Sequence, residues 1–288
     1  MNPIPWNALK SSVTMIECGL CFHHCKLEEG QTGFCRARKN VQGKIISLNQ
    51  ARYSSIALDP IEKKPLLYFY PGSMILSLGS AGCNLRCPFC QNYSISMAKP
   101  EDLRMKELSP KEAVDLALSL KPQGNIGIAF TYNEPLINFE TVLETCRLAK
   151  AADLKTVLVT NGTIEPTYLE TLLPYIDALN IDLKGFTQSF YTQLFGNLES
   201  VKKTIAMSAK VSHVEITTLI IPGKNDNDED MAAEAQWLAS IDPDLPLHIT
   251  RFFPRYLWDD LKPTPVETLM RLKTVAKQYL HRVHIGNV

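Results

Sequence analysis

The sequence lacks an excess of charge of either sign. Its 30 basic and 30 acidic side chains cancel to a formal net charge of zero over 288 residues. Proteins that bind nucleic acid or an anionic membrane surface need surplus positive charge to neutralise phosphates. The balance therefore disfavours nucleic acid or a membrane as partner and favours a protein or a small molecule.

The sequence also lacks long apolar runs. No stretch of 18 apolar residues occurs, so there is no candidate transmembrane helix. Residues 1–10 contain no charged segment that leads into an apolar run, so we expect no secretory signal there. We therefore expect a cytoplasmic protein. Apolar residues make up 45% of the chain and charged residues 21%, which is typical of a folded globular protein and not of a disordered one.

Cysteine is unusually well represented, and most of the cysteines are clustered. They form a first cluster of Cys18, Cys21, Cys25 and Cys35, a second cluster of Cys83, Cys87 and Cys90, and the isolated Cys146. Where thiols stay reduced, clustered cysteines bind metal more often than they form disulfides. We therefore predict a metal site at each cluster and a plain core position for Cys146, which lies in an apolar helical segment.

After residue 74, short β-rich runs alternate with longer helical patterns. The β runs cover 75–79, 126–130, 156–160, 178–183, 214–221 and 247–251, and the helical patterns cover 110–120, 136–152, 165–173, 187–209, 227–240 and a last segment from 264. Prolines are expected at the first helical position of three of them, at Pro110, Pro166 and Pro265. Six β-α units in succession predict an α/β fold with a parallel sheet, because each strand needs a crossover to return to the same edge. The sheet is either a partial barrel or a doubly wound sheet, and both place the chemistry at the carboxyl ends of the strands.

Residues 1–74 form the other expected unit. This segment holds the first cysteine cluster and short β runs at 44–48 and 66–70. We expect a small N-terminal Cys-rich metal-binding module with a connecting hairpin over 1–74, packed against a barrel domain over 75–288.

The second cysteine cluster follows the first predicted barrel strand. Cys83, Cys87 and Cys90 have the spacing Cys-x3-Cys-x2-Cys, without a fourth cysteine nearby. Three thiolates can bind three irons of a [4Fe–4S] cluster and leave the fourth iron open, as in a catalytic site. The alternative is a zinc site that a distant histidine completes. The loop position, the spacing and the aromatic Phe89 before the last cysteine favour the iron–sulfur cluster.

This motif, placed after the first strand of a partial barrel, resembles the radical S-adenosylmethionine (SAM) superfamily. The resemblance runs over about residues 75–286 and implies a partial (β/α)6 TIM-type barrel, with a [4Fe–4S] cluster and SAM as cofactors. It implies an oxidoreductase that cleaves SAM reductively to a 5′-deoxyadenosyl radical, which abstracts hydrogen from a substrate. It also implies an electron donor of flavodoxin or ferredoxin type. The barrel mouth must then exclude water and competing hydrogen donors.

The resemblance further implies SAM-binding residues at the strand ends. They are Phe89, Asn92, Glu134, Thr160, Asn161, Asp182, Lys184, His248 and Arg251. Glu134 stands where pyruvate formate-lyase activating enzymes have a Gly-Gly-Glu-Pro turn that binds the methionine amine, although Tyr132 and Asn133 replace both glycines. The segments 160–162 and 182–184 are similar to the Thr-Asn-Gly and Asp-Leu-Lys of those enzymes. The alternatives are that Glu134 caps the next helix, that Asp182 and Lys184 form an ordinary ion pair, and that His248 has only a structural role.

The first cluster, with the spacing Cys-x2-Cys-x3-Cys-x9-Cys over residues 18–35, offers four thiolates. Structural zinc is the simplest interpretation, because a small module has little core and a metal would stabilise it directly. An auxiliary iron–sulfur cluster is the alternative, and His23 or His24 could replace one ligand. Together with residues 61–66 and 90–92, this pattern resembles the radical SAM enzyme of the AmmeMemoRadiSam system, which is similar to pyruvate formate-lyase activating enzyme. That resemblance implies protein partners from the same system.

Three functions follow from these patterns. The leading hypothesis is a radical SAM enzyme that abstracts hydrogen from an unidentified substrate. The second is the activation of a glycyl-radical enzyme by abstraction from a backbone glycine. The third is a zinc-binding protein on a barrel scaffold without a redox role, which would be colourless.

Overall fold

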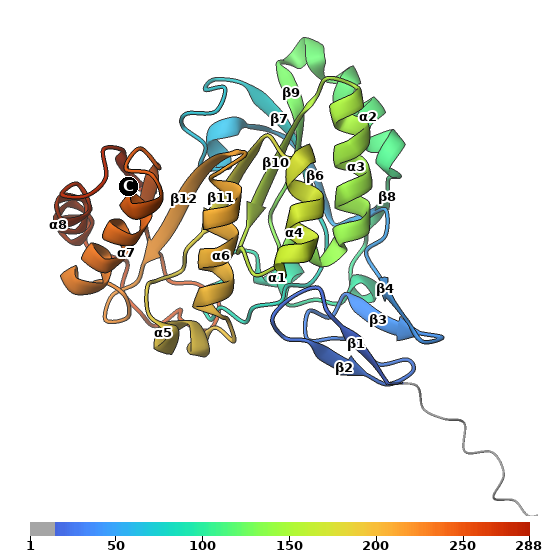
Figure 1. Ribbon diagram of the computed structural model, residues 1–288, viewed down its shortest axis with the longest axis horizontal. Helices are drawn as coiled ribbons and strands as arrows, with labels where there is room; N and C mark the ends of the chain where they lie inside the picture. Colours follow the sequence, from blue (N-terminus) through green and yellow to red (C-terminus); the bar gives the residue numbers. More distant parts are fainter. Residues whose placement is uncertain (1–14) are drawn as a thin grey trace, which may run out of the picture.

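The computed structural model describes residues 15–288, and its centre is one eight-stranded sheet (Figure 1). The prediction made for residues 1–10 lies outside the described residues. In chain order the strands of this sheet are β6 (Ser55–Pro60), β7 (Met74–Gly79), β9 (Asn125–Phe130), β10 (Lys155–Thr160), β11 (Ala178–Asp182), β12 (His213–Ile220), β13 (Leu247–Arg251) and β14 (Val283–Gly286). Their spatial order is β14-β13-β12-β11-β10-β9-β7-β6, and every neighbouring pair is parallel except β6 and β7. The strands follow chain order across the sheet without the reversal of a doubly wound sheet, and β14 and β6 are open edges, so the predicted partial barrel is confirmed.

The sequence predicts six parallel strands, and the structure contains seven. All six predicted strands are present, and β14 is the addition. It pairs with β13 from Leu247↔Val283 to Thr250↔Gly286. With only four residues, two of them histidine and glycine, β14 carries too little apolar alternation to be recognised in the sequence.

Within residues 15–288, eight α-helices connect the strands. Helices α2, α3, α4 and α6 lie side by side along the sheet (Figure 1). The helices are α1 (Tyr93–Ser96), α2 (Pro110–Ser119), α3 (Phe139–Ala151), α4 (Pro166–Leu172), α5 (Gln188–Gln193), α6 (Leu198–Ser208), α7 (Asp228–Ile241) and α8 (Val266–Ala276). The prolines open α2 and α4 as predicted, whereas Pro265 is the N-cap of α8. No helix among residues 15–288 is long and apolar enough to cross a membrane.

The predicted single helix over 187–209 is wrong, because two helices occupy this segment. Gly196 lies between α5 and α6, where a Cβ would come 2.8 Å from the Tyr191 ring. Asn197 begins the second helix, since its side chain accepts a hydrogen bond from the Ser200 amide at 2.9 Å. Apolar residues recur at helical spacing through both helices, so the sequence pattern does not reveal that Asn197 begins a second helix.

Small antiparallel sheets beside the barrel make up most of the described N-terminal segment. They pair β1 (Ile16–Cys18) with β2 (Cys25–Leu27), β3 (Arg38–Val41) with β4 (Lys44–Ser47), and β5 (Arg52–Tyr53) with β8 (Lys106–Glu107). Arg38 joins them to α3, because its guanidinium donates to both carboxylate oxygens of Glu140 at 2.9 and 2.7 Å. Strand β6 also belongs to residues 1–74, yet it pairs along its whole length with β7 and extends the main sheet.

Residues 61–73, between β6 and β7, pack against the amino-terminal end of the barrel, and we call them the plug segment. Their buried apolar residues are Ile61, Leu66 and Phe69, which pack with Ile75, Ala129, Val157 and Ala178. The amides of Leu67 and Tyr68 donate to the carboxylate of Glu215 on β12 at 3.0 and 2.8 Å. The predicted strand at 66–70 is therefore wrong, because the amides of this segment bond to the buried Glu215 carboxylate and not to a neighbouring strand.

Candidate active site

A cavity of about 780 Å³ is lined both by the carboxyl ends of the barrel strands and by the plug segment on the amino-terminal side. Its walls come from the loop after β7, the ends of β9, β10 and β11, the inner face of β12–β14, and the plug segment. The cavity is lined by Cys83, Cys87 and Cys90 and by eight of the nine predicted SAM-binding residues, Phe89, Asn92, Glu134, Thr160, Asn161, Asp182, Lys184 and His248. The fold thus brings residues from distant parts of the sequence into one site.

The loop that carries the second cysteine cluster packs tightly against the N-terminal module. Gly82 begins it with a left-handed φ of 84°, and a Cβ there would lie 2.3 Å from the Cys35 carbonyl oxygen. The Arg86 guanidinium donates to the carbonyl oxygens of Cys83 and Phe34 and lies 4.0 Å from the centre of the Phe34 ring. The module and the barrel therefore hold the start of this loop between them.

Asn84 connects the same loop to three neighbours. Its Nδ2 donates to the Thr163 hydroxyl at 2.9 Å, and its Oδ1 accepts from Asn161 Nδ2 at 2.9 Å. Its carbonyl oxygen lies 2.8 Å from His23 Nε2. His23, considered above as a spare metal ligand, is thus engaged with the cysteine loop.

The three thiols of the second cluster suit an iron–sulfur cluster. Burial raises the pKa of Cys83, and it raises the pKa of Cys87 to about 12, so these thiols ionise when a metal takes them as ligands. Asn161 Nδ2 donates a hydrogen bond to Cys83 Sγ at 3.7 Å. Hydrogen bonds to the ligating sulfurs tune the reduction potential of an iron–sulfur cluster. Residues 15–288 contain no set of three Cys, His, Asp or Glu side chains gathered around one metal-ion position. A [4Fe–4S] cluster does not need such a set, because each thiolate binds a different iron.

Glu134 is buried at the cavity wall and is held from three directions. It accepts hydrogen bonds from the Leu136 amide at 2.9 Å, the Asn161 amide at 2.8 Å and the Thr160 hydroxyl at 2.8 Å. The bond to Leu136 means that Glu134 does cap the following 3₁₀ helix while it also lines the cavity. Burial raises the pKa of Glu134 to about 7, against the effect of these hydrogen bonds, so a cationic partner would favour its ionised form.

Tyr132 occupies a glycine-like position beside Glu134. Its φ is 73°, in the left-handed region, and its hydroxyl donates to Asp59. Its carbonyl oxygen accepts from Asn92 Nδ2 at 2.7 Å. The turn that has two glycines in the similar enzymes therefore keeps a left-handed residue here, stabilised by contacts of the side chain and the carbonyl.

Asp182 and Lys184 form an ion pair in the cavity, with 2.7 Å between Lys184 Nζ and Asp182 Oδ2. Burial opposes the charge of Lys184, but Asp182 raises the pKa of this amine above its ordinary value.

Phe89 is buried and packs against Phe190 and Trp258, with ring centres 6.5 and 5.5 Å away. These contacts fix an aromatic wall beside the cysteine loop.

Of the two residues of β13 that were predicted to bind SAM, His248 and Arg251, only His248 lies in the cavity wall. His248 lines the cavity and is buried, with its Nε2 2.6 Å from Glu215 Oε2. Arg251 is not among the residues that line the cavity, because its Nε donates to the Thr264 carbonyl at 2.8 Å and its guanidinium lies over the Phe253 ring. Arg251 is therefore the one predicted SAM-binding residue that the structure does not place in the cavity wall.

Sequence reasoning missed the polar residues of the cavity that the plug segment and β12–β14 supply. Lys64 is 1% exposed and pairs with Asp59 at 2.8 Å. Thr217 and His284 also line the cavity, and Glu215 lies under His248. A glutamate within the apolar run 214–221 was the available signal, because a buried carboxylate requires partners.

The first cysteine cluster lies in the N-terminal module. Cys18 and Cys25 face each other in the β1–β2 pairing, and Cys18 and Cys35 are buried. His24 turns away to Glu17 and Glu165, at 3.1 and 3.4 Å. Cys146 is fully buried in the core, as predicted.

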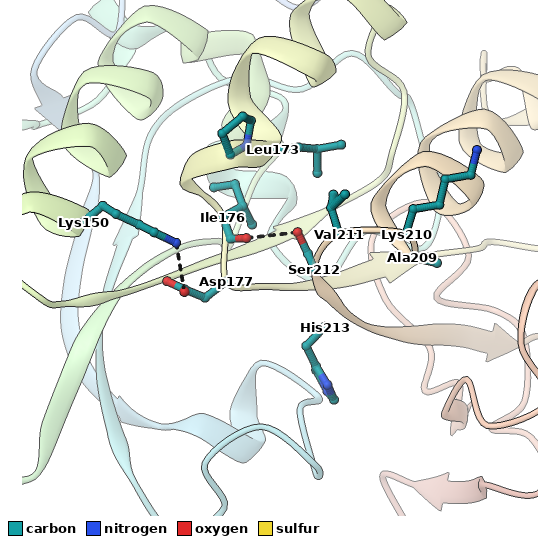
Figure 2. Close-up of a pocket in the computed structure, with 10 residues that line it drawn as sticks. Lys150, Leu173, Ile176, Asp177, Ala209, Lys210, Val211, Ser212 and His213 are labelled. Carbon is teal, nitrogen blue, oxygen red and sulfur yellow. Dashed lines mark hydrogen bonds and ion pairs between the residues drawn. The ribbon is translucent and has the colours of Figure 1, made fainter.

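A second hollow lies at the opposite, amino-terminal ends of β10–β12 (Figure 2). Lys150 pairs there with Asp177 at 3.4 Å, and the Ser212 hydroxyl donates to the Ile176 carbonyl at 3.0 Å (Figure 2). His213, which also lines this hollow, bonds to Glu215 at 2.8 Å. The hollow contains no cysteine, so we place the chemistry in the cavity of the cysteine loop.

Comparisons with known proteins agree with this geometry. Residues 78–238 match the family model of the radical SAM superfamily. An uncharacterised protein of Methanocaldococcus jannaschii is 37% identical over 95% of this chain and 81% of its own length. Pyruvate formate-lyase 1-activating enzyme of Escherichia coli is 25% identical over 70% of this chain and 88% of its own length.

Solved structures support the fold. QueE from Escherichia coli superposes with a TM-score of 0.51 at 15% identity, over 83% of this chain and 95% of its own. SuiB from Streptococcus suis gives a TM-score of 0.57 at 15% identity, over 74% of this chain and 50% of its own.

Proposed function

The chain belongs to the radical SAM superfamily, and we propose from that premise that the cavity at the cysteine loop binds the cluster and SAM together and a substrate beside them. The chain is an enzyme, and its cofactors are a [4Fe–4S] cluster and SAM. When bound, they supply the family chemistry, in which reductive cleavage of SAM gives a 5′-deoxyadenosyl radical that abstracts hydrogen. The observation that carries the proposal is that three thiols without a fourth line the same cavity as a buried carboxylate and an ion pair.

The residues of the cavity divide into ligands and positioning groups in this proposal. Cys83, Cys87 and Cys90 bind three irons and leave one iron for the methionine end of SAM. Glu134, oriented by Thr160 and the Asn161 amide, accepts hydrogen bonds from the methionine amine, and the positive amine favours the carboxylate form.

The remaining positioning groups surround this centre. Lys184, fixed by Asp182, presents a positive charge that suits the SAM carboxylate or ribose. Asn92 supports the turn at Tyr132, and Phe89 excludes water from the cysteine loop.

We further propose that residues 1–74 act as the metal-binding module and a connecting hairpin, whose strand β6 joins the sheet of the barrel domain over 75–288. The first cluster would hold zinc or an auxiliary iron–sulfur cluster, since it offers four thiols in a small module. Zinc would have to draw these thiols together around one ion, whereas each thiol of an iron–sulfur cluster binds a separate iron. An electron donor of flavodoxin or ferredoxin type would reduce the catalytic cluster, and the chain would act in the cytoplasm with protein partners.

A second candidate function is the activation of a glycyl-radical enzyme. The similarity to pyruvate formate-lyase 1-activating enzyme over 70% of the chain favours it. An organic radical signal that appears on a co-purifying protein after reaction with SAM would distinguish activation from action on a small molecule.

The proposal is tested by metal analysis of protein that is purified and reconstituted without oxygen. Wild type should be brown and contain iron and sulfide, and Cys87→Ala should lose that iron but keep the metal of the first cluster. Cys146→Ala is the matched control, because it removes a buried thiol outside both clusters. A colourless wild type, or iron that is unchanged in Cys87→Ala, would contradict the assignment.

A further inference from the structure

The wall of the cavity formed by β12–β14 is polar and has no role in the function proposed above. Thr217, His248 and His284 stand side by side in the parallel register of β12–β14, next to the Lys184-paired Asp182 at the end of β11, and all three line the cavity. Strands β12–β14 are at the far end of the sheet from β7, whose loop carries the second cysteine cluster. This wall is therefore placed for a molecule other than the cluster.

Glu215 fixes His248 within this row. It is 0% exposed, and its two oxygens accept from the amides of Leu67 and Tyr68 and lie 2.8 and 2.6 Å from the Nε2 atoms of His213 and His248. Burial opposes ionisation, but these four hydrogen bonds lower the pKa of Glu215 to about 2. An ionised carboxylate can only accept, so His248 Nε2 carries hydrogen and Nδ1 is the nitrogen left for the cavity.

His284 is arranged in the same way. Its ring stacks on that of His248, with centres 5.6 Å apart, and its Nε2 lies 2.8 Å from the Tyr68 hydroxyl. Burial and the neighbouring His248 lower the pKa of His284, so it is neutral near pH 7. When Nε2 accepts from Tyr68, Nδ1 carries the hydrogen of the neutral ring. Among residues 15–288, neither Nδ1 atom has a hydrogen-bond partner.

We propose that His248 and His284 bind an anionic oxygen group of the substrate, a carboxylate or a phosphate. This inference rests on the proposed function, since it takes the cavity to hold a substrate beside SAM. His284 donates to the anion from Nδ1. His248 takes up one proton from solution at Nδ1 and donates it to the same group, while Glu215 balances the imidazolium from the other side.

Several charged or titratable groups surround this pair and define its environment. They are Glu215 and His213 on β12, Asp182 on β11, Lys64 and Tyr68 of the plug segment, and Lys273 and Lys277 at the carboxyl end of α8. Asp59 neutralises Lys64, and Lys184 neutralises Asp182. The positive charge on His248 is therefore added where these two pairs are neutral, beside Glu215 and within the field of Lys273 and Lys277.

The test uses the full chain, reconstituted with its cluster and labelled with ¹⁵N in the histidine rings. Inorganic phosphate, acetate and acetamide are titrated separately while the ring nitrogens are followed by NMR. We expect phosphate or acetate to shift the Nδ1 resonances of His248 and His284, and the anion with the higher affinity identifies the substrate group as phosphate or carboxylate. Acetamide, a neutral molecule of the same shape as acetate, should cause no such shift.

Variants distinguish anion binding by His248 and His284 from a general effect of added salt. His248→Gln should weaken binding of the preferred anion by about tenfold or more, because a hydrogen bond to a charged group is lost. Glu215→Gln should weaken it as well, since the carboxylate that balances the imidazolium of His248 is gone. His281→Gln is the matched control, because His281 is exposed and bonded to Asp244 outside the cavity.

The inference is overturned if neither anion shifts the two Nδ1 resonances, if acetamide shifts them equally, or if His281→Gln weakens binding as much as His248→Gln does. The proposed function is tested on the same wild-type sample by its formation of 5′-deoxyadenosine from SAM. Because one assay needs no SAM and the other needs no anion, the failure of either is distinguished from the failure of the other.

Discussion

Replacement of Gly82 by alanine tests how the N-terminal module and the cysteine loop depend on each other. An alanine at φ 84° has a left-handed backbone that costs about 1–2 kcal/mol. Its Cβ would also lie 2.3 Å from the Cys35 carbonyl oxygen, so the loop or the module must move by almost an ångström. Overpacking of this kind typically costs about 1–3 kcal/mol more. We expect Gly82→Ala to lower the free energy of unfolding by about 2–5 kcal/mol and, because Cys83 is the next residue, to reduce the iron bound.

Gly223→Ala separates the two contributions. Gly223 has a left-handed φ of 70° but no heavy atom within 4 Å of the position of its Cβ. This variant should lose only the backbone contribution and keep its iron. The assays are urea denaturation and the iron and sulfide content after anaerobic reconstitution. Equal stability of the two variants, with full iron in Gly82→Ala, would refute the reasoning.

Three further predictions concern single side chains. Glu134→Gln should weaken SAM binding by about tenfold or more in equilibrium dialysis, because the carboxylate for the methionine amine is lost, and an unchanged affinity would count against that role. Glu234 is buried and its pKa is raised from 4.5 to about 8, so its contribution to stability is full below pH 4.5 and is lost as the pH rises through 8. Urea denaturation at several pH values should show a decline of up to about 5 kcal/mol in wild type that Glu234→Gln lacks, and parallel profiles would contradict this. Cys18→Ala should lose the metal of the first cluster and keep the iron of the second, as measured by zinc and iron analysis, and the joint loss of both metals would show that the sites are not separate.

The sequence was informative where one local signal determined the structure. The short apolar runs became the strands β7 and β9–β13, and Pro110 placed the start of α2. The spacing of Cys83, Cys87 and Cys90 was enough to identify the chemistry, because a cluster ligand set lies within one loop.

The rest of the site depends on contacts between distant segments. The plug segment has the apolar composition of a strand, but Glu215, almost 150 residues later, takes its amide hydrogen bonds. Arg251 was expected at the cavity because it ends a barrel strand, yet the carbonyl of Thr264 holds its guanidinium elsewhere. Such pairings leave no local periodicity, and only the assembled barrel shows them.

The formation of 5′-deoxyadenosine tests the central claim most directly. Protein that is reconstituted without oxygen, reduced and given SAM should release 5′-deoxyadenosine, and Cys87→Ala, treated in the same way, should release none. A wild-type sample with a full complement of iron and sulfide that forms no 5′-deoxyadenosine would contradict the assignment of the cavity as a radical SAM site.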